Sequence, residues 1–572
     1  MDQPLKTDVA IIGGGPAGLM LAIELGCRGI ACTLLEEDAT SPVLPKANAT
    51  SARTMEHYRR RGFASQIRAL GLPDHHPQDV VYTTRIAGRE LTRFQIPSTG
   101  QARAQTSFGD YGPDAWPTPE LPHRAQQMYI EPILKAQAES HPSVSVRFGA
   151  RALAVIDQGP QVRVDYVDTA SGEARQLEAR YVVGCDGPRS LVRQTMGVAY
   201  AGEGVVKRDF LGGQMVSIYF RAPDLVARLG KPPAWQYWAM NRQQRGLLCA
   251  INGIDSFALL LQLADGAKVD AIHLPTVFEQ IIGVAFDHEL IALTPWSAGF
   301  ALVAQQFRRG RLMLAGDAAH LFTPTGGMGY NTSVDDVVNL GWKLALVLQG
   351  HAPEGLLDSY QAERHPIAER NTGFARSMAE SIGNLPVPAD VEAPGAAGDA
   401  ARLALSQALA LHVTREFNIP GLQLGLCYAG SPIVARESAP PPPDEPNHYQ
   451  PSGYPGARAP HLSVGSASLL DYFGRDFTLL VFDAASTADW EREAARLGLT
   501  LKLLRWADET GRALYVASRV LIRPDHHIAW RGAADAAAAP VLACATGRLA
   551  SRPSPSPITS PITSPITSQV SA

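Results

Sequence analysis

A glycine turn near the N-terminus constrains the fold of this chain more than any other feature. An apolar stretch at residues 8–12 runs into a turn made of Gly13, Gly14, Gly15, Pro16, Ala17 and Gly18. Gly13 permits a tight turn, Gly15 lets the backbone approach a diphosphate, and Gly18 lets a following helix pack closely on the strand. Pro16 suits the first helical turn, where the amides around Ala17 are free to bind an anion. The pattern predicts a Rossmann-type strand-turn-helix unit that binds a dinucleotide.

An acidic residue follows this turn at the expected spacing. Glu36 ends the next apolar stretch, about twenty residues further along the chain. A carboxylate at this position accepts hydrogen bonds from an unphosphorylated ribose. FAD or NAD therefore suits the unit better than NADP.

A second motif brings an acid and a glycine to the end of an apolar stretch. Residues 181–185 lead to Asp186 and Gly187, and a helix start follows. On its own this segment is equally typical of a simple strand-to-helix turn, so its meaning depends on the other motifs.

A third motif combines an acid with a glycine-rich loop. Asp317 ends an apolar stretch and is well placed to bind a sugar or ribityl hydroxyl. The loop at 324–331 leads into a long helix, whose N-terminus can stabilise negative charge on a reduced flavin. His320 lies between them, and we interpret it chiefly as a residue that packs the loop.

The length of 572 residues predicts several domains. We expect a dinucleotide-binding domain in two parts, interrupted by a β-rich domain and followed by a helical segment with a Pro-rich linker, a small α/β domain, and a disordered tail of SPIT repeats. The boundaries are 1–204 and 301–395 for the two parts, 205–300 for the β-rich domain, 396–460 for the helical segment and linker, 461–550 for the small domain and 551–572 for the tail. In the small domain we predict one helix at 487–498 and strands at 477–482, 501–506, 512–518 and 519–524.

Composition excludes several classes of partner. The net charge of −4 gives no reason to expect nucleic acid or a membrane surface, and no apolar stretch reaches the roughly 18 residues that cross a bilayer. The N-terminus has no signal-peptide pattern, so we expect a cytoplasmic protein. Cys27 and Cys32 are spaced as in disulfide-reducing flavoenzymes, but they fall at a helix end and in a strand beside the adenosine. We predict neither a redox-active disulfide nor a metal site.

Taken together, the three motifs resemble those of the class A flavoprotein aromatic monooxygenases, in the same order and over residues 8–370. The segments 359–370 and 457–462 resemble the phenol hydroxylase branch, whose C-terminal domain is thioredoxin-like. The resemblance implies an α/β fold in which the FAD-binding domain is interleaved with a β-rich substrate domain. The C-terminal domain here contains Cys544 and no C-x-x-C, so we expect it to serve homodimer formation or to cover the pocket, without a redox role.

The resemblance also implies a reaction. NADH or NADPH reduces FAD, O₂ adds at the flavin C4a position, and the hydroperoxide hydroxylates a phenolic ring during aromatic catabolism. By the same resemblance, Arg53 lines the route by which the flavin swings or the nicotinamide enters. The residues expected to hold FAD are Gly13, Gly15, Pro16, Ala17, Gly18, Glu36, Arg53, Gln127, Asp186 and Asp317, with Gly327, Met328, Gly329 and Asn331 at the isoalloxazine.

The substrate pocket departs from the family at one position. Relatives can carry an acid where this chain has Asn48, and an amide is no base. We hypothesise that Asn48 orients the substrate while Tyr237 or His320 helps to ionise it, or that the substrate arrives already ionised. With Pro324 of the glycine loop, these are the candidate catalytic residues. The aromatic cluster at 235–238 is expected either to contact the ring or to belong to the core.

Three other functions remain open at this point. A flavin-dependent halogenase shares the N-terminal motifs, but its W-x-W-x-I-P segment with a catalytic lysine is not matched at 235–240. Another FAD oxidoreductase or a flavin-binding protein without activity are the further alternatives. The sequence names neither the aromatic substrate nor its ring position, and it leaves open a coupled denitration, dehalogenation or decarboxylation.

Overall fold

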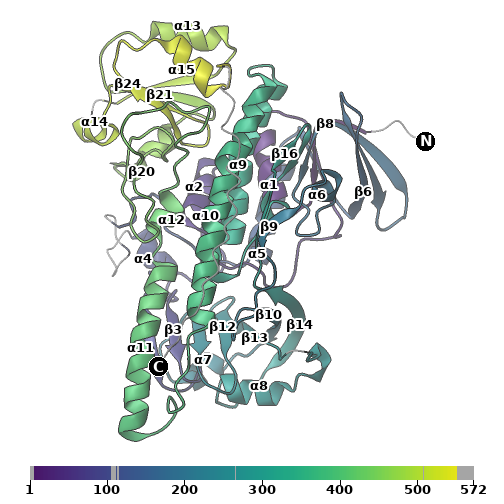
Figure 1. Cartoon of the computed structure of the whole chain (residues 1–572), viewed down its shortest axis with the longest axis vertical. Helices are drawn as coiled ribbons and strands as arrows, with labels where there is room; N and C mark the ends of the chain where they lie inside the picture. Colours follow the sequence, from purple (N-terminus) through teal and green to yellow (C-terminus); the bar gives the residue numbers. More distant parts are fainter. Residues whose placement is uncertain (1–4, 105–110, 112–114, 265, 507, 550–572) are drawn as a thin grey trace, which may run out of the picture.

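The structure is a computed structural model that describes residues 5–104, 111, 115–264, 266–506 and 508–549. The predicted tail at 551–572 lies outside the described residues. Figure 1 shows the small C-terminal domain at one end of the long axis and the β10–β14 sheet at the other. The N-terminal sheet lies beside the C-terminal domain in the same half of the molecule, and the long helices α9 and α10 run between the two.

Parallel strands form the centre of the N-terminal sheet, in the order β17-β8-β1-β2-β5. Ile12 of β1 pairs with Gly184 of β8, and Leu314 of β17 pairs with the same glycine. The carboxyl ends of these three strands therefore meet at one edge, which brings the three predicted motifs together. The strands of this sheet are β1 (Leu5–Ile12), β2 (Cys32–Glu36), β5 (Val144–Phe148), β6 (Ala150–Asp157), β7 (Val162–Asp168), β8 (Ala174–Gly184), β16 (Arg308–Arg309) and β17 (Leu312–Leu314).

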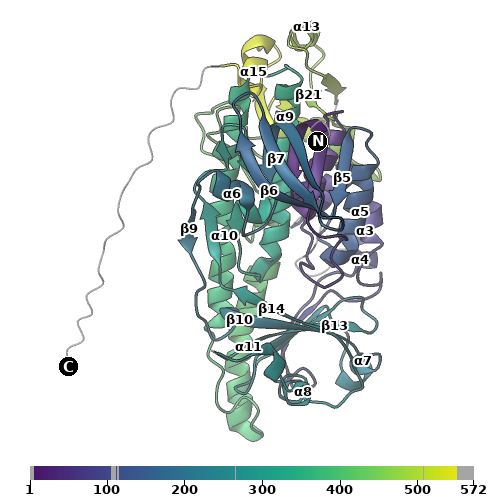
Figure 2. The same ribbon diagram turned by 90° about the vertical axis from the view of Figure 1, so that its right-hand side faces the viewer.

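The second sheet has the order β14-β10-β13-β12-β11-β3-β4 and is antiparallel except between β11 and β3. The β-rich stretch predicted at 205–300 supplies five of these strands, and β3 and β4 join them from far earlier in the chain. Figure 2 shows α7 and α8 beneath this sheet. The elements are β3 (Val80–Thr83), β4 (Glu90–Phe94), β10 (Gly213–Arg221), β11 (Gln236–Ala239), β12 (Gly246–Ala250), β13 (Ser256–Gln262), β14 (Glu289–Ala298), α7 (Leu225–Leu229) and α8 (Leu274–Ile281).

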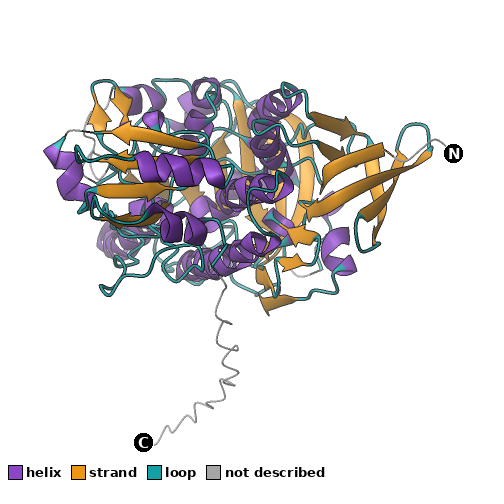
Figure 3. Cartoon of the chain, turned by 90° about the horizontal axis from the view of Figure 1, so that it is seen from above, coloured by secondary structure: helices purple, strands orange, loops and turns teal. Residues whose placement is uncertain are grey.

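Long helices connect the two sheets. Helix α9 packs on α1 behind the glycine turn, and α10 and α11 extend toward the second sheet (Figure 1). Seen from above, many helices lie between the strands of the N-terminal sheet and those of the C-terminal domain (Figure 3). The helices outside the C-terminal domain include α1 (Pro16–Gly26), α2 (Ala52–Arg60), α3 (Ala64–Arg68), α4 (Thr99–Arg103), α5 (Gln127–Glu139), α6 (Leu191–Thr195), α9 (Met328–Leu348), α10 (Asp358–Gly383), α11 (Gly395–Phe417) and α12 (Pro420–Leu424). A small sheet of β9 (Tyr200–Glu203), β15 (Ala301–Ala304) and β18 (His320–Leu321) lies beside α10.

The C-terminal domain is built on a four-stranded sheet in the order β22-β21-β23-β24. The strand predicted at 512–518 is wrong, because Glu509–Tyr515 form helix α14. Asp508 caps this helix by accepting hydrogen bonds from the amides of Thr510 and Gly511. The strand prediction relied on the apolar alternation at 512–518 and overlooked this cap. The elements are β19 (Ser463–Val464), β20 (Ala467–Ser468), β21 (Phe477–Val481), α13 (Ala488–Arg496), β22 (Leu501–Arg505), α14, β23 (Arg519–Ile522), β24 (Ile528–Gly532) and α15 (Ala538–Ala545).

The cysteines, the helices and the possible metal ligands were also the subject of predictions from the sequence. Cys27 caps the C-terminus of α1 and Cys32 begins β2, as the spacing predicted, and all six cysteines are free. Among the described residues, no helix is both long and apolar enough to cross a membrane. The same residues contain no group of three or more His, Cys, Asp or Glu side chains arranged to hold a metal ion.

Candidate functional site

The three glycines of the first motif have two different surroundings. Gly13 has a φ of +107°, and a Cβ there would lie 2.2 Å from the carbonyl oxygen of Cys185. A Cβ on Gly18 would lie 2.0 Å from the Gly13 carbonyl oxygen, whereas a Cβ on Gly15 would meet nothing within 4 Å. Gly13 and Gly18 are thus required by protein packing, and Gly15 leaves open space in front of the helix.

Helix α1 begins with free amides at this open space. Pro16 is its first residue, Gly15 is its N-cap, and no side chain caps the amides. Glu36 lies beside the turn and accepts bonds from the backbone N–H groups of Gly14 at 2.5 Å and Asp38 at 2.9 Å. The unit therefore has amide donors that suit a diphosphate, and the role of Glu36 at a ribose stays a prediction.

Two other acids at the same edge have unused hydrogen-bonding capacity. Asp186 follows β8, burial raises its pKa, and its Oδ1 atom is buried without a hydrogen-bond partner in the described structure. Asp317 follows β17, and its side chain is exposed to solvent. The surrounding protein nevertheless removes part of its hydration, which raises its pKa. Carboxylate oxygens without a hydrogen-bond partner suit a ligand rich in hydroxyl groups. The ribose and ribityl groups of FAD carry such hydroxyl groups.

Asp317 offers a direct test of this fit. Because its side chain forms no hydrogen bond within the described structure, Asp317→Ala should leave the apoprotein within about 0.5 kcal/mol of wild-type stability. Loss of a charged hydrogen bond should weaken FAD about 10- to 100-fold. Titration of apoprotein with FAD, followed by flavin fluorescence, measures this change. An unchanged affinity would show that Asp317 does not contact the cofactor.

The glycine loop predicted at the flavin ring leads into α9 as expected. Gly326 and Gly327 both have positive φ, of 68° and 62°, and α9 begins at Met328, followed by Gly329. Asn331 holds the loop in place, since its amide donates to the carbonyls of Gly327 at 2.6 Å and Ala49 at 2.9 Å. Its Oδ1 atom accepts the N–H of Ser51 at 2.7 Å. Asn331 thus joins the loop to the segment that carries Asn48.

A cavity of about 80 Å³ lies between this loop and the second sheet. Its walls come from the segment before α2, the segment before α5, the sheet, the glycine loop and the end of α11. Phe417 meets Trp235 edge-on, with ring centroids 6.0 Å apart. The lining residues are Asn48, Ala49, Ser51, Arg124, Leu211, Trp235, Gln236, Trp238, Leu247, Leu260, Pro324, Thr325, Gly326, Gly327, Asn331, Glu416, Phe417, Ile419 and Gln423.

Two candidate catalytic residues line this cavity and two do not. Asn48 and Pro324 belong to its wall. The Tyr237 hydroxyl instead accepts the N–H of Ala234 at 2.7 Å, and burial raises its pKa to about 12. Its neighbour Trp238 points to the cavity, because successive side chains of a strand alternate between faces. Tyr237 is therefore poorly placed to ionise a substrate.

His320 and Arg53 are both engaged in buried contacts elsewhere. The Nε2 atom of His320 lies 2.6 Å from Oδ2 of Asp336, whose other oxygen accepts from Arg364 at 2.8 Å. Arg53 donates to Glu56 at 3.0 Å and to the carbonyl of Asp525 at 2.5 Å. These contacts support the packing role for His320. Arg53 contacts the C-terminal domain, and its place on the cofactor route stays a prediction.

The remaining predicted residue, Gln127, lies at the start of α5. Its side chain donates to Glu131, and burial raises the pKa of that glutamate to about 7. Sequence reasoning missed several residues of the cavity wall, and Arg124, Glu416 and Gln423 are among them. Glu416 and Gln423 come from the stretch expected to be a helical segment and linker, and only the fold brings them to the flavin loop.

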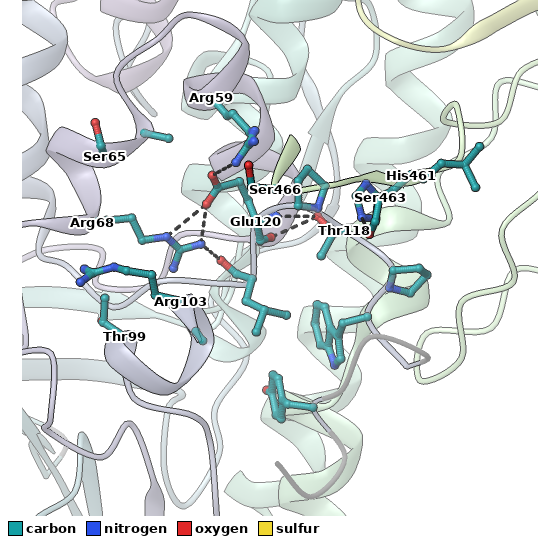
Figure 4. A pocket seen from close by; sticks show the side chains of 18 of the residues that line it. Arg59, Ser65, Arg68, Thr99, Arg103, Thr118, Glu120, His461, Ser463 and Ser466 are labelled. Carbon is teal, nitrogen blue, oxygen red and sulfur yellow. Dashed lines mark hydrogen bonds and ion pairs between the residues drawn. The ribbon is translucent and has the colours of Figure 1, made fainter. Parts of the chain in front are cut away.

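A larger hollow of about 800 Å³ lies between α2, α3 and the start of the C-terminal domain (Figure 4). Glu120 lies inside it and accepts from Arg59 at 3.1 Å and from Arg68 at 2.9 Å. Arg103 at its rim pairs with Asp74 at 2.8 Å. Its charges are thus paired, and none of its described lining residues belongs to the three motifs. We therefore assign the candidate site to the smaller cavity.

Comparison with known proteins agrees with this geometry. Residues 6–375 match the family described as FAD binding domain, and residues 452–553 match aromatic-ring hydroxylase, C-terminal. The chain is 31% identical over 575 residues to 4-methyl-5-nitrocatechol 5-monooxygenase from Burkholderia sp, an alignment that covers 93% of this chain and 96% of that protein. It is 28% identical over 578 residues to phenol 2-monooxygenase from Pseudomonas sp. (strain EST1001), covering 92% and 90%.

Solved structures give the same assignment. RebC with bound 7-carboxy-K252c superposes with a TM-score of 0.86 at 30% identity, covering 95% of this chain and all of that one. Aklavinone-11 hydroxylase in complex with FAD and aklavinone gives a TM-score of 0.77 at 27% identity, covering 96% of this chain and all of that one. The chain belongs to the FAD-binding family that these proteins share. Within it, the chain is a flavoprotein aromatic hydroxylase.

Proposed function

We propose that this protein uses NADH or NADPH and O₂ to hydroxylate a small phenolic compound in the catabolism of aromatic compounds. The observation that carries the proposal is the cavity itself, which lies directly against the glycine loop and is walled by Trp235, Trp238 and Phe417. Flat aromatic side chains stack on a flat ring. The relatives named for nitrocatechol and phenol support a single-ring substrate.

The size of the cavity also favours one ring. Its volume of about 80 Å³ is smaller than the roughly 150 Å³ of an engineered cavity that holds benzene. A polycyclic substrate would need a much larger displacement of these walls than a monocyclic phenol. The polycyclic ligands of the RebC and aklavinone hydroxylase structures are therefore poorer guides to this substrate than the single-ring relatives.

Bound FAD would supply electron transfer and the activation of O₂ at this site. Gly15 would leave room for it beside the free amides of α1, Asp186 and Asp317 would hold it by carboxylate oxygens without a described partner, and Glu36 would accept from its ribose. The apolar part of the wall, which includes Leu211, Leu247 and Leu260, would limit the access of water to the reacting ring and so reduce wasteful release of H₂O₂. Asn48 in the wall orients the substrate hydroxyl by hydrogen bonding. We place the enzyme in the cytoplasm, where nicotinamide reductants are held, and we propose that it acts as a homodimer.

Oxygen uptake over a panel of phenols tests this function. Purified protein should be yellow and should oxidise NADH or NADPH only slowly until a suitable monocyclic phenol is added. The phenol should then increase the rate, and a hydroxylated product should accumulate in proportion to the reductant consumed. Stoichiometric H₂O₂ without a product would reveal mere ligand-triggered leakage, and halogenated product formed with chloride or bromide would favour a halogenase. No response to any phenol would overturn the proposal.

A further inference from the structure

Glu416 is a buried carboxylate in the wall of the substrate cavity. It lies in the last turn of α11 and is 3% exposed. One of its oxygens, Oε1, accepts the N–H of Gly326 in the glycine loop at 2.9 Å. The other, Oε2, is buried and has no hydrogen-bond partner in the described structure. An unsatisfied carboxylate oxygen in a cavity wall suits a hydroxyl donor that arrives with the substrate.

A histidine stands directly behind this oxygen. The Nε2 atom of His412, one helical turn earlier, lies 2.9 Å from Oε2 of Glu416. The angle between the two groups does not suit a hydrogen bond, and Nε2 has no hydrogen-bond partner among the described residues. The Nδ1 atom lies 3.1 Å from the hydroxyl of Ser381, which is partly exposed. From β3, Tyr82 meets the His412 ring edge-on, and its hydroxyl is likewise buried without a partner. His412 and Ser381 thus form a path of polar groups from the Glu416 carboxylate toward solvent.

A cation completes the cavity. Arg124 is 6% exposed and lies over the Trp235 ring, with 4.2 Å between its guanidinium carbon and the ring centroid. Its guanidinium forms no hydrogen bond or ion pair with any described residue, and its Nε atom is buried without a partner. Burial lowers its pKa to about 10, so it stays charged at neutral pH. An unpaired buried guanidinium is unfavourable until an anion arrives, which points to a negatively charged oxygen on the ligand.

We propose that Glu416 is the general base that ionises the phenolic substrate, and that Arg124 holds the phenolate. The phenol O–H bond breaks, the proton forms a new bond with Oε2 of Glu416, and the electron pair remains on the phenolate oxygen. The proton then passes to His412 Nε2 while His412 releases its Nδ1 proton toward Ser381 and solvent. The phenolate is the more electron-rich ring and the better acceptor of oxygen. This inference rests on the proposed hydroxylation.

Glu416 supplies the base that the other candidate residues do not provide in this cavity. Asn48 cannot accept the proton, and the structure turns Tyr237 and His320 away from the wall. Glu416 is the one described carboxylate that lines the cavity. The titratable groups near it are His412 on its own helix and Tyr82 from β3, and Arg124 lines the same cavity.

The resting oxidised enzyme tests the assignment without turnover. 4-Nitrophenol is added to FAD-loaded protein at a pH below the pKa of the free phenol, and its absorption band reports its ionisation. Wild type should bind it as the anion. Glu416→Gln, which keeps an oxygen for the Gly326 amide, should bind it as the neutral phenol, with the titration midpoint raised by about one pH unit or more. Arg124→Gln should raise the midpoint too.

Kinetics with a series of phenols give the second readout. Glu416→Gln should lose about 100-fold in kcat for weakly acidic phenols, the usual scale of general-base catalysis, and less than about 3-fold for nitrophenols that are ionised in solution. Asp399→Asn removes an exposed carboxylate from the other end of α11 and should match wild type in both measurements. An equal loss for all phenols, or an unchanged midpoint, would overturn the role of Glu416.

Two checks separate this proposal from the proposed function and from misfolding. Glu416→Gln should retain the flavin content and visible spectrum of wild type, and His412→Gln, which leaves Glu416 in place, should show a smaller loss that is again confined to weakly acidic phenols. If His412→Gln and Glu416→Gln both match wild type, the base lies elsewhere. If wild type ionises 4-nitrophenol but hydroxylates nothing, the base assignment stands and the proposed hydroxylation fails.

Discussion

Replacing Gly18 with alanine should prevent the N-terminal domain from folding. The new Cβ would lie 2.0 Å from the Gly13 carbonyl oxygen, and its next neighbour is a side-chain carbon of Ile11 at 3.3 Å. Relief requires α1 to move off β1, because the obstacle is backbone. We expect a loss of more than about 3 kcal/mol, which is large against a total stability of roughly 5–15 kcal/mol. Soluble yield, circular dichroism and flavin content measure the outcome.

Gly15→Ala is the matched control for this result. A Cβ on Gly15 meets nothing within 4 Å, and its φ of −73° suits alanine. The apoprotein should therefore fold with a loss within about 1 kcal/mol, as for other helix N-caps. Its FAD affinity should fall about 100-fold or more, because the methyl group occupies the space through which the diphosphate approaches. Equal behaviour of the two variants would contradict the distinction between packing glycine and ligand-facing glycine.

The second large effect concerns the ion pair that joins the C-terminal domain to α2. Arg458 donates two bonds to Glu56, one at 2.9 Å, and both side chains are buried. Arg458→Met leaves the buried Glu56 with Arg53 and the hydroxyl of Thr118 as its described partners. Loss of one partner of a buried ion pair costs about 3–5 kcal/mol. Calorimetry should show a Tm lower by several degrees. The double variant with Glu56→Gln should recover little of the loss, because it leaves the buried guanidinium of Arg53 without its carboxylate partner.

The pH dependence of this pair has a definite sign. Burial alone would raise the pKa of Glu56, but Arg458 and Arg53 overcome it and hold the pKa at about 2, below the ordinary value of 4.5. The pair therefore stabilises the fold fully above pH 4.5 and less as pH falls toward 2. In Arg458→Met only Arg53 and the Thr118 hydroxyl still oppose the effect of burial, so the pKa of Glu56 is higher than in wild type. The deficit of that variant relative to wild type should shrink on acidification, and a deficit that grew would contradict the assignment.

Much of the cofactor site could be predicted because its signals are local. The turn at Gly13–Gly18 and the acids Asp186 and Asp317 each follow an apolar strand within a few residues. Parallel pairing of β1, β8 and β17 then brings strand ends together by a general rule of such sheets. Sequence spacing and sheet geometry agree at this edge, so the prediction of the FAD-binding fold was confirmed.

The substrate cavity could not be predicted in the same way. Arg124, Trp238 and Glu416 come from three separate regions, and no spacing rule connects them. The direction of the aromatic cluster depended on strand register, which placed Trp238 in the cavity and Tyr237 outside it. Glu416 had no local signal, since a lone acid near the end of an Ala-rich helix is ordinarily a solvated side chain. Only the packing of α11 against the glycine loop gives it a chemical role.

Hydroxylation as proposed inserts one atom of O₂ into a phenolic ring. The most direct measurement is product analysis by mass spectrometry after turnover with NADH or NADPH, a responsive monocyclic phenol and ¹⁸O₂ in ordinary water. Monooxygenation should place one ¹⁸O atom in each hydroxylated product molecule. A product that carries oxygen from water, or oxidation of the nicotinamide that yields H₂O₂ and no product, would contradict it.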